Sequence, residues 1–301
     1  MIIRECNFQP FMIDSRCFRR GILLELLTQE GKTATAEISP LPGYSKEHLD
    51  NALGQLQTIK RRLLTTWWTK QALYSLDGLG LFPSVYFGVE SALLDLLDPL
   101  PTAPPCKSYA LLLGSPEEIL SRAEEIEKEG FTHAKVKIGH LSRSVAHEVI
   151  DSLASRFSLR LDLNRQWPFH ETEAFCKKYP YEQFDYIEEP AADPSDILLF
   201  SYPFALDETL RESRTLTPYL NSPHLKALIL KPTLLYPLRS YLNLEKKIVL
   251  TSSFEGATGI GQIKRLVHRL GLEETYHGLD TLRYLESHEH LPHRPFQQAT
   301  P

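Results

Sequence analysis

The sequence predicts an α/β protein in which a closed barrel of parallel strands follows a smaller N-terminal α+β unit. From residue 106 onward, short apolar runs that suit strands alternate with segments that have the spacing of amphipathic helices. Seven or eight such units fall within about 180 residues, which fits a closed barrel better than an open sheet. Before residue 98 the order differs, because strands come first and helices follow.

The N-terminal unit, expected over residues 1–98, should begin with a hairpin. Residues 21–27 are an apolar run, and residues 33–38 alternate between apolar and polar side chains. The polar, glycine-containing residues 28–32 between these runs predict the turn.

Helices are expected in the second half of this unit. Ser45 is a candidate N-cap for a helix that runs toward Leu64. Residues 85–97 carry apolar side chains at helical spacing. The proline-rich segment 98–105 is typical of a linker, because proline fixes the backbone and donates no hydrogen bond.

The barrel is expected over residues 106–282. Its first helix has clear boundary signals: Ser115 as a cap, Pro116 and acidic residues in the first turn, and Gly130 at the end. The runs expected to form strands are 109–113, 134–138, 159–163, 186–188, 205–207, 227–231 and 248–252.

Composition excludes several classes of protein. The 301 residues are 42% hydrophobic and carry a net charge of −5, so a sizeable core is expected and nucleic-acid binding is not. Neither a membrane span nor a signal peptide is evident, which favours a cytoplasmic location. The four cysteines are scattered, which favours free thiols. The oligomeric state stays open, and a monomer is compatible with the composition.

Acidic side chains stand at the ends of three successive predicted strands: Asp162, Glu188 and Asp207. Every strand of a parallel barrel points its C-terminal end at the same mouth, so these carboxylates should converge. Three converging carboxylates need a counter-ion, and Mg²⁺ suits oxygen ligands. The simpler interpretation is that each acid is solvated or paired with a nearby lysine, but three at successive strand ends favour a metal site.

Lysines flank this acidic series on both sides. Lys135 and Lys137 are two residues apart, so on a strand both should point into the barrel mouth. Lys231, after a later strand, should face them across the mouth. A second cation beside Lys137 favours its neutral amine, which can act as a base.

These motifs resemble the enolase superfamily, in its muconate-lactonising-type branch. Residues 37–45, 83–90 and 278–282 further resemble the o-succinylbenzoate synthase family, and the resemblance extends to about residue 285. The superfamily motifs are Lys135-x-Lys137, Asp162-x-Asn164, Glu188-Glu189-Pro190, Asp207-Glu208 and Lys231-Pro232.

The resemblance implies a modified (β/α)7β barrel of the TIM type with an α+β capping domain, to which residues 283–301 return. It also implies a lyase with a small-molecule carboxylate substrate. That substrate would be 2-succinyl-6-hydroxy-2,4-cyclohexadiene-1-carboxylate, which is dehydrated to o-succinylbenzoate in menaquinone biosynthesis.

By the same resemblance, Asp162, Glu188 and Asp207 bind Mg²⁺, with Mn²⁺ as an alternative ion. Glu189 and Glu208 are then neighbours of the ligands and do not bind the ion directly.

The lysine roles follow from the same resemblance. Lys137 removes the proton next to the substrate carboxylate, which leaves an enediolate that Mg²⁺ stabilises, and then returns a proton to the departing hydroxyl. Lys231 lies over the opposite face of the ring, where a cation is stabilising. Lys135 keeps Lys137 basic and contacts the carboxylate.

Four further residues are candidates for binding the substrate. Arg160 and Asn164 stand beside Asp162 and are expected at the mouth, where they could orient ligands or line the ring pocket. Ser252 and Ser253 end the strand expected over 248–252 and offer hydroxyl groups to the succinyl carboxylate. Glu255 lies close by and is given no role.

A loop between Phe11 and Arg20, together with segment 40–45, is expected to close the site from the cap and so exclude water. Near the C-terminus, His288, His290 and His293 are closely spaced. A polar tail is the favoured interpretation of these histidines, and a metal site is the alternative.

Two other functions fit parts of the pattern. An N-succinylamino acid racemase or dipeptide epimerase on the same scaffold also needs lysines on opposite faces of its substrate. A non-catalytic binding protein on a degenerate barrel should have lost at least one ligand or lysine, whereas all are present here.

Overall fold

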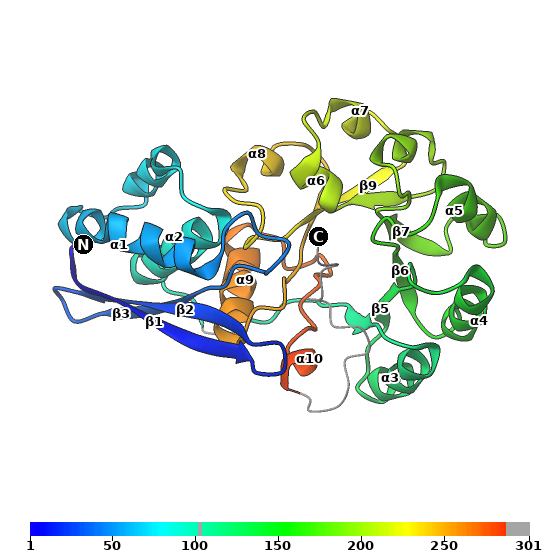
Figure 1. The fold of residues 1–301 in the computed structure, drawn as a ribbon, viewed down its shortest axis with the longest axis horizontal. Coiled ribbons are helices and arrows are strands. Elements are labelled where there is room, and N and C mark those ends of the chain that lie inside the picture. Colours follow the sequence, from blue (N-terminus) through cyan, green and yellow to red (C-terminus); the bar gives the residue numbers. More distant parts are fainter. Residues whose placement is uncertain (102–103, 287–301) are drawn as a thin grey trace.

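The computed structural model describes residues 1–101 and 104–286. It places a three-stranded antiparallel sheet with its helices beside a curled, seven-stranded parallel sheet (Figure 1). The predicted fold class is therefore confirmed: an α+β cap beside a barrel of parallel strands. Each part has its own hydrophobic core.

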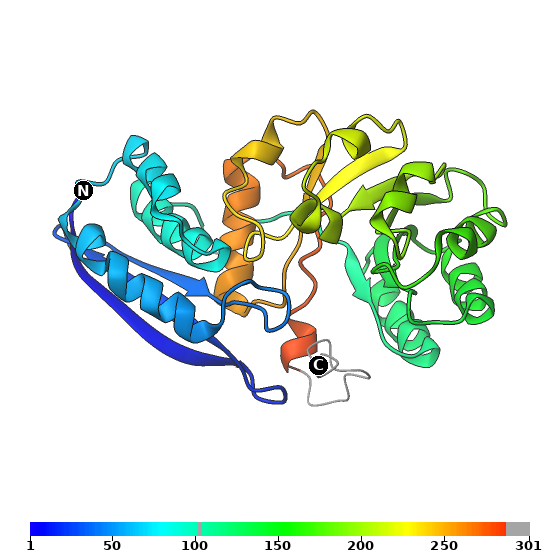
Figure 2. The same cartoon turned by 45° about the horizontal axis from the view of Figure 1, so that its top comes forward.

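The cap begins with the predicted hairpin, to which one earlier strand is added. Helices cover one face of this sheet, because its strands alternate buried and exposed side chains. Figure 2 shows α1 and α2 lying along the sheet. The elements of the cap are β1 (Ile3–Asp14), β2 (Arg19–Thr28), β3 (Thr33–Ile38), α1 (Leu49–Thr65), η1 (Gln71–Leu79) and α2 (Pro83–Leu97).

Two expectations about the cap were wrong. Ser45 does not cap a helix: α1 starts at Leu49 with His48 as its N-cap, and the Ser45 hydroxyl instead accepts a hydrogen bond from the Leu41 N–H. Most of segment 11–20 is not a loop, because β1 and β2 pair almost to their ends and leave only a short turn.

The barrel alternates strands and helices as expected, and its strands lie in chain order from β4 to β10. All six pairings between neighbouring strands are parallel. The elements are β4 (Ala110–Leu112), α3 (Pro116–Lys128), β5 (His133–Lys137), α4 (Arg143–Leu153), β6 (Ser158–Asp162), α5 (Phe169–Cys176), β7 (Phe184–Glu188), η2 (Pro194–Leu199), β8 (Phe204–Leu206), α6 (Glu208–Glu212), α7 (Thr217–Leu220), β9 (Leu225–Leu230), α8 (Arg239–Leu242), β10 (Lys247–Leu250), α9 (Ala257–Arg269) and α10 (Arg283–Glu286).

Two residues close the barrel in place of an eighth full strand. His277 bridges to Ser108 beside β4, and Gly278 bridges to Thr251 beside β10. The Gly278 N–H also donates to the Leu250 carbonyl at 3.0 Å. The two edges of the sheet are thus joined through one short segment.

The cap and the barrel meet along α9, which lies between them in Figures 1 and 2 and contacts β3. Arg16 at the β1–β2 turn donates to the carbonyl of Tyr284 in α10, so this short helix contacts the cap. The three closely spaced histidines, His288, His290 and His293, lie outside the described residues.

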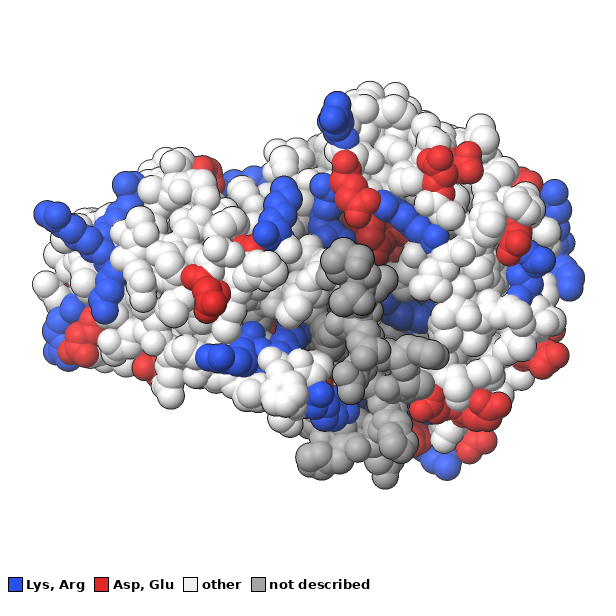
Figure 3. Space-filling model, viewed as in Figure 1, with Lys and Arg blue, Asp and Glu red and all other residues white. Residues whose placement is uncertain are grey.

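Charges of both signs are interspersed over the face drawn in Figure 3, and its described residues form no broad patch of one sign. None of the helices within residues 1–101 and 104–286 combines the length and the apolarity that a membrane span requires.

The closure segment gives a pH-dependent prediction. His277 is buried, its Nδ1 accepts from the Leu250 N–H, and its Nε2 lies 3.0 Å from the Leu272 carbonyl. Both contacts suit the neutral ring, and burial lowers the pKa of His277 to about 4. Between pH 6.5 and 4 the unfolded chain therefore binds the proton while the folded chain does not, so stability falls as the pH falls.

We expect His277 to contribute a loss of about 2 kcal/mol in the free energy of unfolding between pH 7 and pH 5. Urea unfolding at the two pH values, with His277→Gln as the reference, measures this contribution. Equal pH dependence in the two proteins would contradict the assignment.

Candidate active site

The predicted acids meet at the C-terminal ends of neighbouring strands. Asp162 ends β6 and pairs in register with Glu188 at the end of β7, and Asp207 directly follows β8. Each of the three side chains is 1% exposed. The parallel register therefore brings carboxylates that are far apart in the chain to one rim, as the sequence predicts.

Lys135 lies between two of these acids. Its Nζ donates to both carboxylate oxygens of Glu188 at 2.7 Å and lies 2.9 Å from Asp162 Oδ2. Burial alone would lower the pKa of Lys135, but the Asp162 and Glu188 carboxylates outweigh it and raise that pKa. Lys135 therefore remains a cation at neutral pH.

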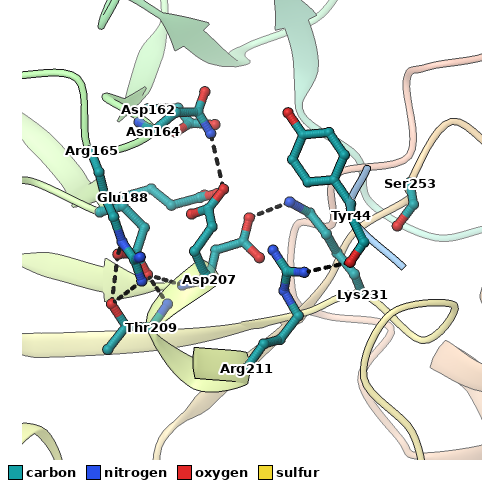
Figure 4. Close-up of polar contacts among 12 residues, drawn as sticks. Tyr44, Asp162, Asn164, Arg165, Glu188, Asp207, Thr209, Arg211, Lys231 and Ser253 are labelled. Atoms are coloured by element: carbon teal, nitrogen blue, oxygen red, sulfur yellow. Dashed lines mark hydrogen bonds and ion pairs between the residues drawn. The ribbon is translucent and has the colours of Figure 1, made fainter. Parts of the chain in front are cut away.

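Lys231 forms a similar ion pair with Asp207, on the strands that follow. It follows β9, and its Nζ donates to Asp207 Oδ2, as Figure 4 shows. Burial would lower the pKa of Lys231, but Asp207 and Glu208 raise it. This lysine is also held as a cation.

Lys137 is paired more weakly than the other two lysines. Its Nζ donates to Asn164 Oδ1 at 3.0 Å and lies 3.5 Å from Asp162. Its side chain is 30% exposed, against 12% for Lys135 and 18% for Lys231. Of the three, Lys137 is the amine most accessible to a small molecule.

The acids outnumber the lysines in this cluster, because the half-buried Glu208 adds a fourth carboxylate. Burial would raise the pKa of Asp162, but Lys135 and Lys137 hold it below its usual range. Burial and then the Asp162 and Asp207 carboxylates raise the pKa of Glu188 to about 8, against the opposing effect of Lys135. Crowding of the acids therefore favours a proton on Glu188 at neutral pH, and a bound cation could take the place of that proton.

Glu189 stabilises the rim through hydrogen bonds to the backbone next to Asp207. It is fully buried, and its Oε1 accepts from the Asp207 N–H at 2.6 Å and from the Thr209 N–H at 2.9 Å. Its Oε2 accepts from the Thr209 hydroxyl and from Arg165 Nε, both at 2.7 Å. Figure 4 shows Arg165 and Thr209 on the side of the cluster away from Lys231. Glu189 thus fixes the backbone that carries Asp207.

Asn164 and Ser252 lie where the sequence predicts them. Asn164 links Lys137 to Glu208, since its Nδ2 lies 3.4 Å from Glu208 Oε1. Ser252 lines a pocket together with all three lysines. The pocket is lined by Tyr109, Leu111, Lys135, Lys137, Lys231, Thr251, Ser252, Phe254, Gly278, Asp280 and Thr281.

Ser253 is buried beside this pocket and does not line it, although its hydroxyl finds no hydrogen-bond partner among the described residues. Glu255, to which the sequence gave no role, is 1% exposed and accepts from the Ser253 N–H at 2.6 Å. A short buried turn therefore follows Ser252, which itself lies two residues beyond the end of β10.

The expected position of Arg160 was wrong. Its guanidinium donates to Asp185 Oδ2 at 2.9 Å and to the Tyr276 carbonyl at 3.0 Å, and it stacks on Tyr109 and Tyr186. Asp185 lies near the start of β7, so the guanidinium points away from the mouth. The strand period sends Arg160 into the barrel, but its long side chain extends toward the opposite end.

The rim offers the oxygen ligands of a divalent-cation site, but these oxygens are not arranged around one point. No three Asp, Glu, His or Cys side chains of the described residues surround a common point that could hold a metal. Lys135 and Lys231 take up the Glu188 and Asp207 oxygens instead. The donor set still fits a hard cation, because it is all oxygen and Glu208 Oε2 is buried without a hydrogen-bond partner in the described part of the chain.

Sequence reasoning missed one residue near the rim. Arg211 in α6 donates from Nη1 to the Tyr44 carbonyl at 3.3 Å, so the cap segment 40–45 contacts the barrel beside Lys231 (Figure 4). Arg211 stands four residues after Asp207, one helical turn beyond the strand end. That spacing was the available signal.

Solved structures share this arrangement of cap and barrel, which is the fold of the enolase superfamily. An o-succinylbenzoate synthase from Thermosynechococcus elongatus BP-1, complexed with Mg in its active site, superposes with a TM-score of 0.70 at 23% identity, over 87% of this chain and 84% of that one. A dipeptide epimerase from Enterococcus faecalis V583 superposes with a TM-score of 0.79 at 16% identity, over 95% and 92%. Identities this low establish the fold alone.

Sequence similarity is more specific. Residues 12–96 match the family described as MenC, N-terminal domain. The o-succinylbenzoate synthase of Vibrio cholerae serotype O1 is 31% identical over 284 residues, which are 88% of this chain and 82% of that protein. The chain belongs to the o-succinylbenzoate synthase family and is an enzyme of the lyase class.

Removal of the Glu189 carboxylate should destabilise the rim. We expect Glu189→Ala to lower the free energy of unfolding by about 3–5 kcal/mol, because Arg165 and two amides lose their buried partner. Glu182→Ala removes an exposed acid of the same chain and should change stability by less than about 0.5 kcal/mol. Urea unfolding of both variants tests this, and equal stabilities would contradict it.

Proposed function

We propose that this protein dehydrates 2-succinyl-6-hydroxy-2,4-cyclohexadiene-1-carboxylate to o-succinylbenzoate, using Mg²⁺. Family membership supports the reaction class. The observation that carries the proposal is the convergence of three lysines on one pocket beside three buried carboxylates and the half-buried Glu208. Removal of a proton next to a carboxylate needs both a base and positive charge to stabilise the developing anion.

Lys137 is the proposed base. Its contact with Asn164 and its greater exposure leave it the lysine best able to approach a bound substrate. It takes the C1 proton, and the electron pair released at C1 forms the new ring double bond as the C6–O bond breaks. The Lys137 ammonium then donates a proton to the departing hydroxyl, which leaves as water. The ring is thereby aromatised, and the amine is regenerated.

Lys135 and Lys231 are the proposed fixed cations. Both are held in the charged state by buried carboxylates, so neither is suited to accept the substrate proton at neutral pH. Lys135 lies on the same strand as Lys137, two residues earlier, so both approach the substrate from one side. Lys231 lies across the rim, where its charge would stabilise the anion and the ring face.

Asp162, Glu188 and Asp207 are the proposed Mg²⁺ ligands, with Mn²⁺ as an alternative ion. When bound, the ion supplies positive charge to the substrate carboxylate. For the ion to bind, Lys135 must release Glu188 and Lys231 must release Asp207. Ser252 and Thr281, whose hydroxyl oxygens lie 2.6 Å apart, are positioned to meet the second carboxylate of the substrate.

The metal requirement can be measured directly. We expect the purified protein to consume the cyclohexadiene substrate, followed by its absorbance, and EDTA to abolish this turnover until excess Mg²⁺ is added. Full activity in EDTA would exclude a metal role. A protein that instead exchanges deuterium into an N-succinylamino acid or a dipeptide, and leaves the cyclohexadiene unchanged, would be a racemase or an epimerase.

The base can be tested by substitution. We expect Lys137→Ala to lower kcat by about 10²–10⁴-fold, the usual contribution of a general base. Lys128→Ala, which removes an exposed lysine from α3, should leave kcat unchanged. Near wild-type turnover by the Lys137→Ala protein would rule out the assignment.

A further inference from the structure

Two buried charged residues of the cap reach into the barrel and bind the backbone of residues 253–259. This segment follows β10 and leads into α9, and it contributes Phe254 to the pocket that the three lysines share. We propose that Arg19 and Glu37 are positioning residues that set the substrate-binding shape of this segment. The inference rests on the proposed function, since it assigns the segment to substrate binding.

Glu37 holds the second half of the segment. It ends β3 of the cap and is 2% exposed. Its Oε1 accepts from the Gly256 N–H and its Oε2 from the Gly259 N–H, each at 2.9 Å. Those N–H groups belong to the first turn of α9, where a helix has no partners of its own. A carboxylate from the cap thus takes the place of a local N-cap, and it adds a favourable charge at the helix N-terminus.

The approach of Glu37 depends on glycine. A Cβ atom on Gly256 would lie 3.0 Å from Glu37 Oε2, and one on Gly259 would lie 3.0 Å from Glu37 Cδ and 2.5 Å from Glu255 Cβ. Larger residues would force the carboxylate away from the helix. The segment and the cap side chain therefore fit each other closely.

Arg19 holds the first half of the segment. It lies at the start of β2 and is 1% exposed. Its Nη1 donates to the Ser253 carbonyl at 2.7 Å and also to the Phe254 carbonyl, and its Nη2 donates to the Ser39 carbonyl at 3.3 Å. One planar guanidinium thus joins a strand of the cap, the cap segment after β3, and the barrel segment.

The backbone between these two contacts is strained. Phe254 has a φ of +58°, a left-handed conformation that a residue with a side chain adopts only when its surroundings enforce it. Arg19 binds the carbonyl of this residue, and Glu37 binds the amide two residues later. We therefore infer that the cap holds Phe254 in this left-handed conformation and thereby sets its position in the pocket.

We call the contacts of Arg19 and Glu37 with residues 253–259 the clamp. The clamp includes neither the lysines nor the acidic rim, so its loss should have a different kinetic effect from damage to the catalytic groups. Loss of the clamp should weaken substrate binding and leave the chemical step largely intact. A general loss of folded protein would instead lower the apparent kcat and leave KM unchanged.

The first test uses Glu37→Gln, because glutamine keeps the size but offers only one acceptor oxygen. We expect KM to rise about tenfold with less than a threefold change in kcat, and amide hydrogen exchange at residues 253–259 to accelerate about tenfold. Glu25→Gln, at an exposed position of β2, is the matched control and should change neither quantity.

The second test uses Arg19→Lys, which keeps the charge but lacks the two separate nitrogens with which the guanidinium reaches Ser39 and residues 253–254. Arg20→Lys, at the adjacent exposed position, is its control. The same rise in KM and the same local exchange are expected, so the proposal does not depend on one variant folding well.

Unchanged exchange at residues 253–259 in both variants would overturn the clamp. Faster exchange without a rise in KM would overturn its role in substrate binding. If the unaltered protein does not dehydrate the cyclohexadiene substrate, the proposed function fails, and the exchange measurement alone then decides whether the cap holds this segment.

Discussion

Buried charge at the rim of the barrel is the constraint on which the rest of the structure depends. Four carboxylates lie at or beside the ends of three neighbouring strands, and three lysines extend among them. An isolated buried charge is costly, and pairs of opposite charge recover that cost only when their geometry is good. Lys135 meets this condition by bridging Asp162 and Glu188 at 2.9 and 2.7 Å. A divalent cation would take the place of the proton that the crowded Glu188 retains at neutral pH.

Much of the surrounding structure holds this rim in place. The parallel register aligns the strand ends, and Glu189 ties the Asp207 backbone to Arg165 and Thr209. The short segment at His277 and Gly278 closes the barrel on the far side of the pocket. The cap adds the last wall, since Arg19 and Glu37 hold the segment between β10 and α9. The site is therefore a product of both parts of the chain.

The sequence was sufficient for the fold and for which residues converge, because both follow from short-range patterns. Strand periodicity placed Lys135 and Lys137 on one face, and the ends of successive strands placed Asp162, Glu188 and Asp207 at one mouth. The helix boundary at Ser115 was equally clear, because its capping box is local.

The sequence could not predict which end of the barrel a long side chain reaches, or which partner it binds there. Arg160 faces into the barrel, as its strand period requires, but its guanidinium extends to the end opposite the acidic rim. There it donates to Asp185 and stacks on two tyrosines. Ser45 is a residue type that often caps helices, but its hydroxyl accepts a hydrogen bond from the Leu41 N–H instead. The contacts of Glu37 with Gly256 and Gly259 join residues more than 200 positions apart, and no local pattern reports them.

The central claim is that the acidic rim exchanges its lysine partners for one divalent cation. Binding of Mn²⁺, followed by electron paramagnetic resonance of the free ion, measures this independently of turnover. The account predicts one tightly bound ion per chain in the unaltered protein and loss of that ion in Glu188→Gln and Asp207→Asn. Absence of a stoichiometric ion in the unaltered protein, or its retention in both variants, would contradict the account.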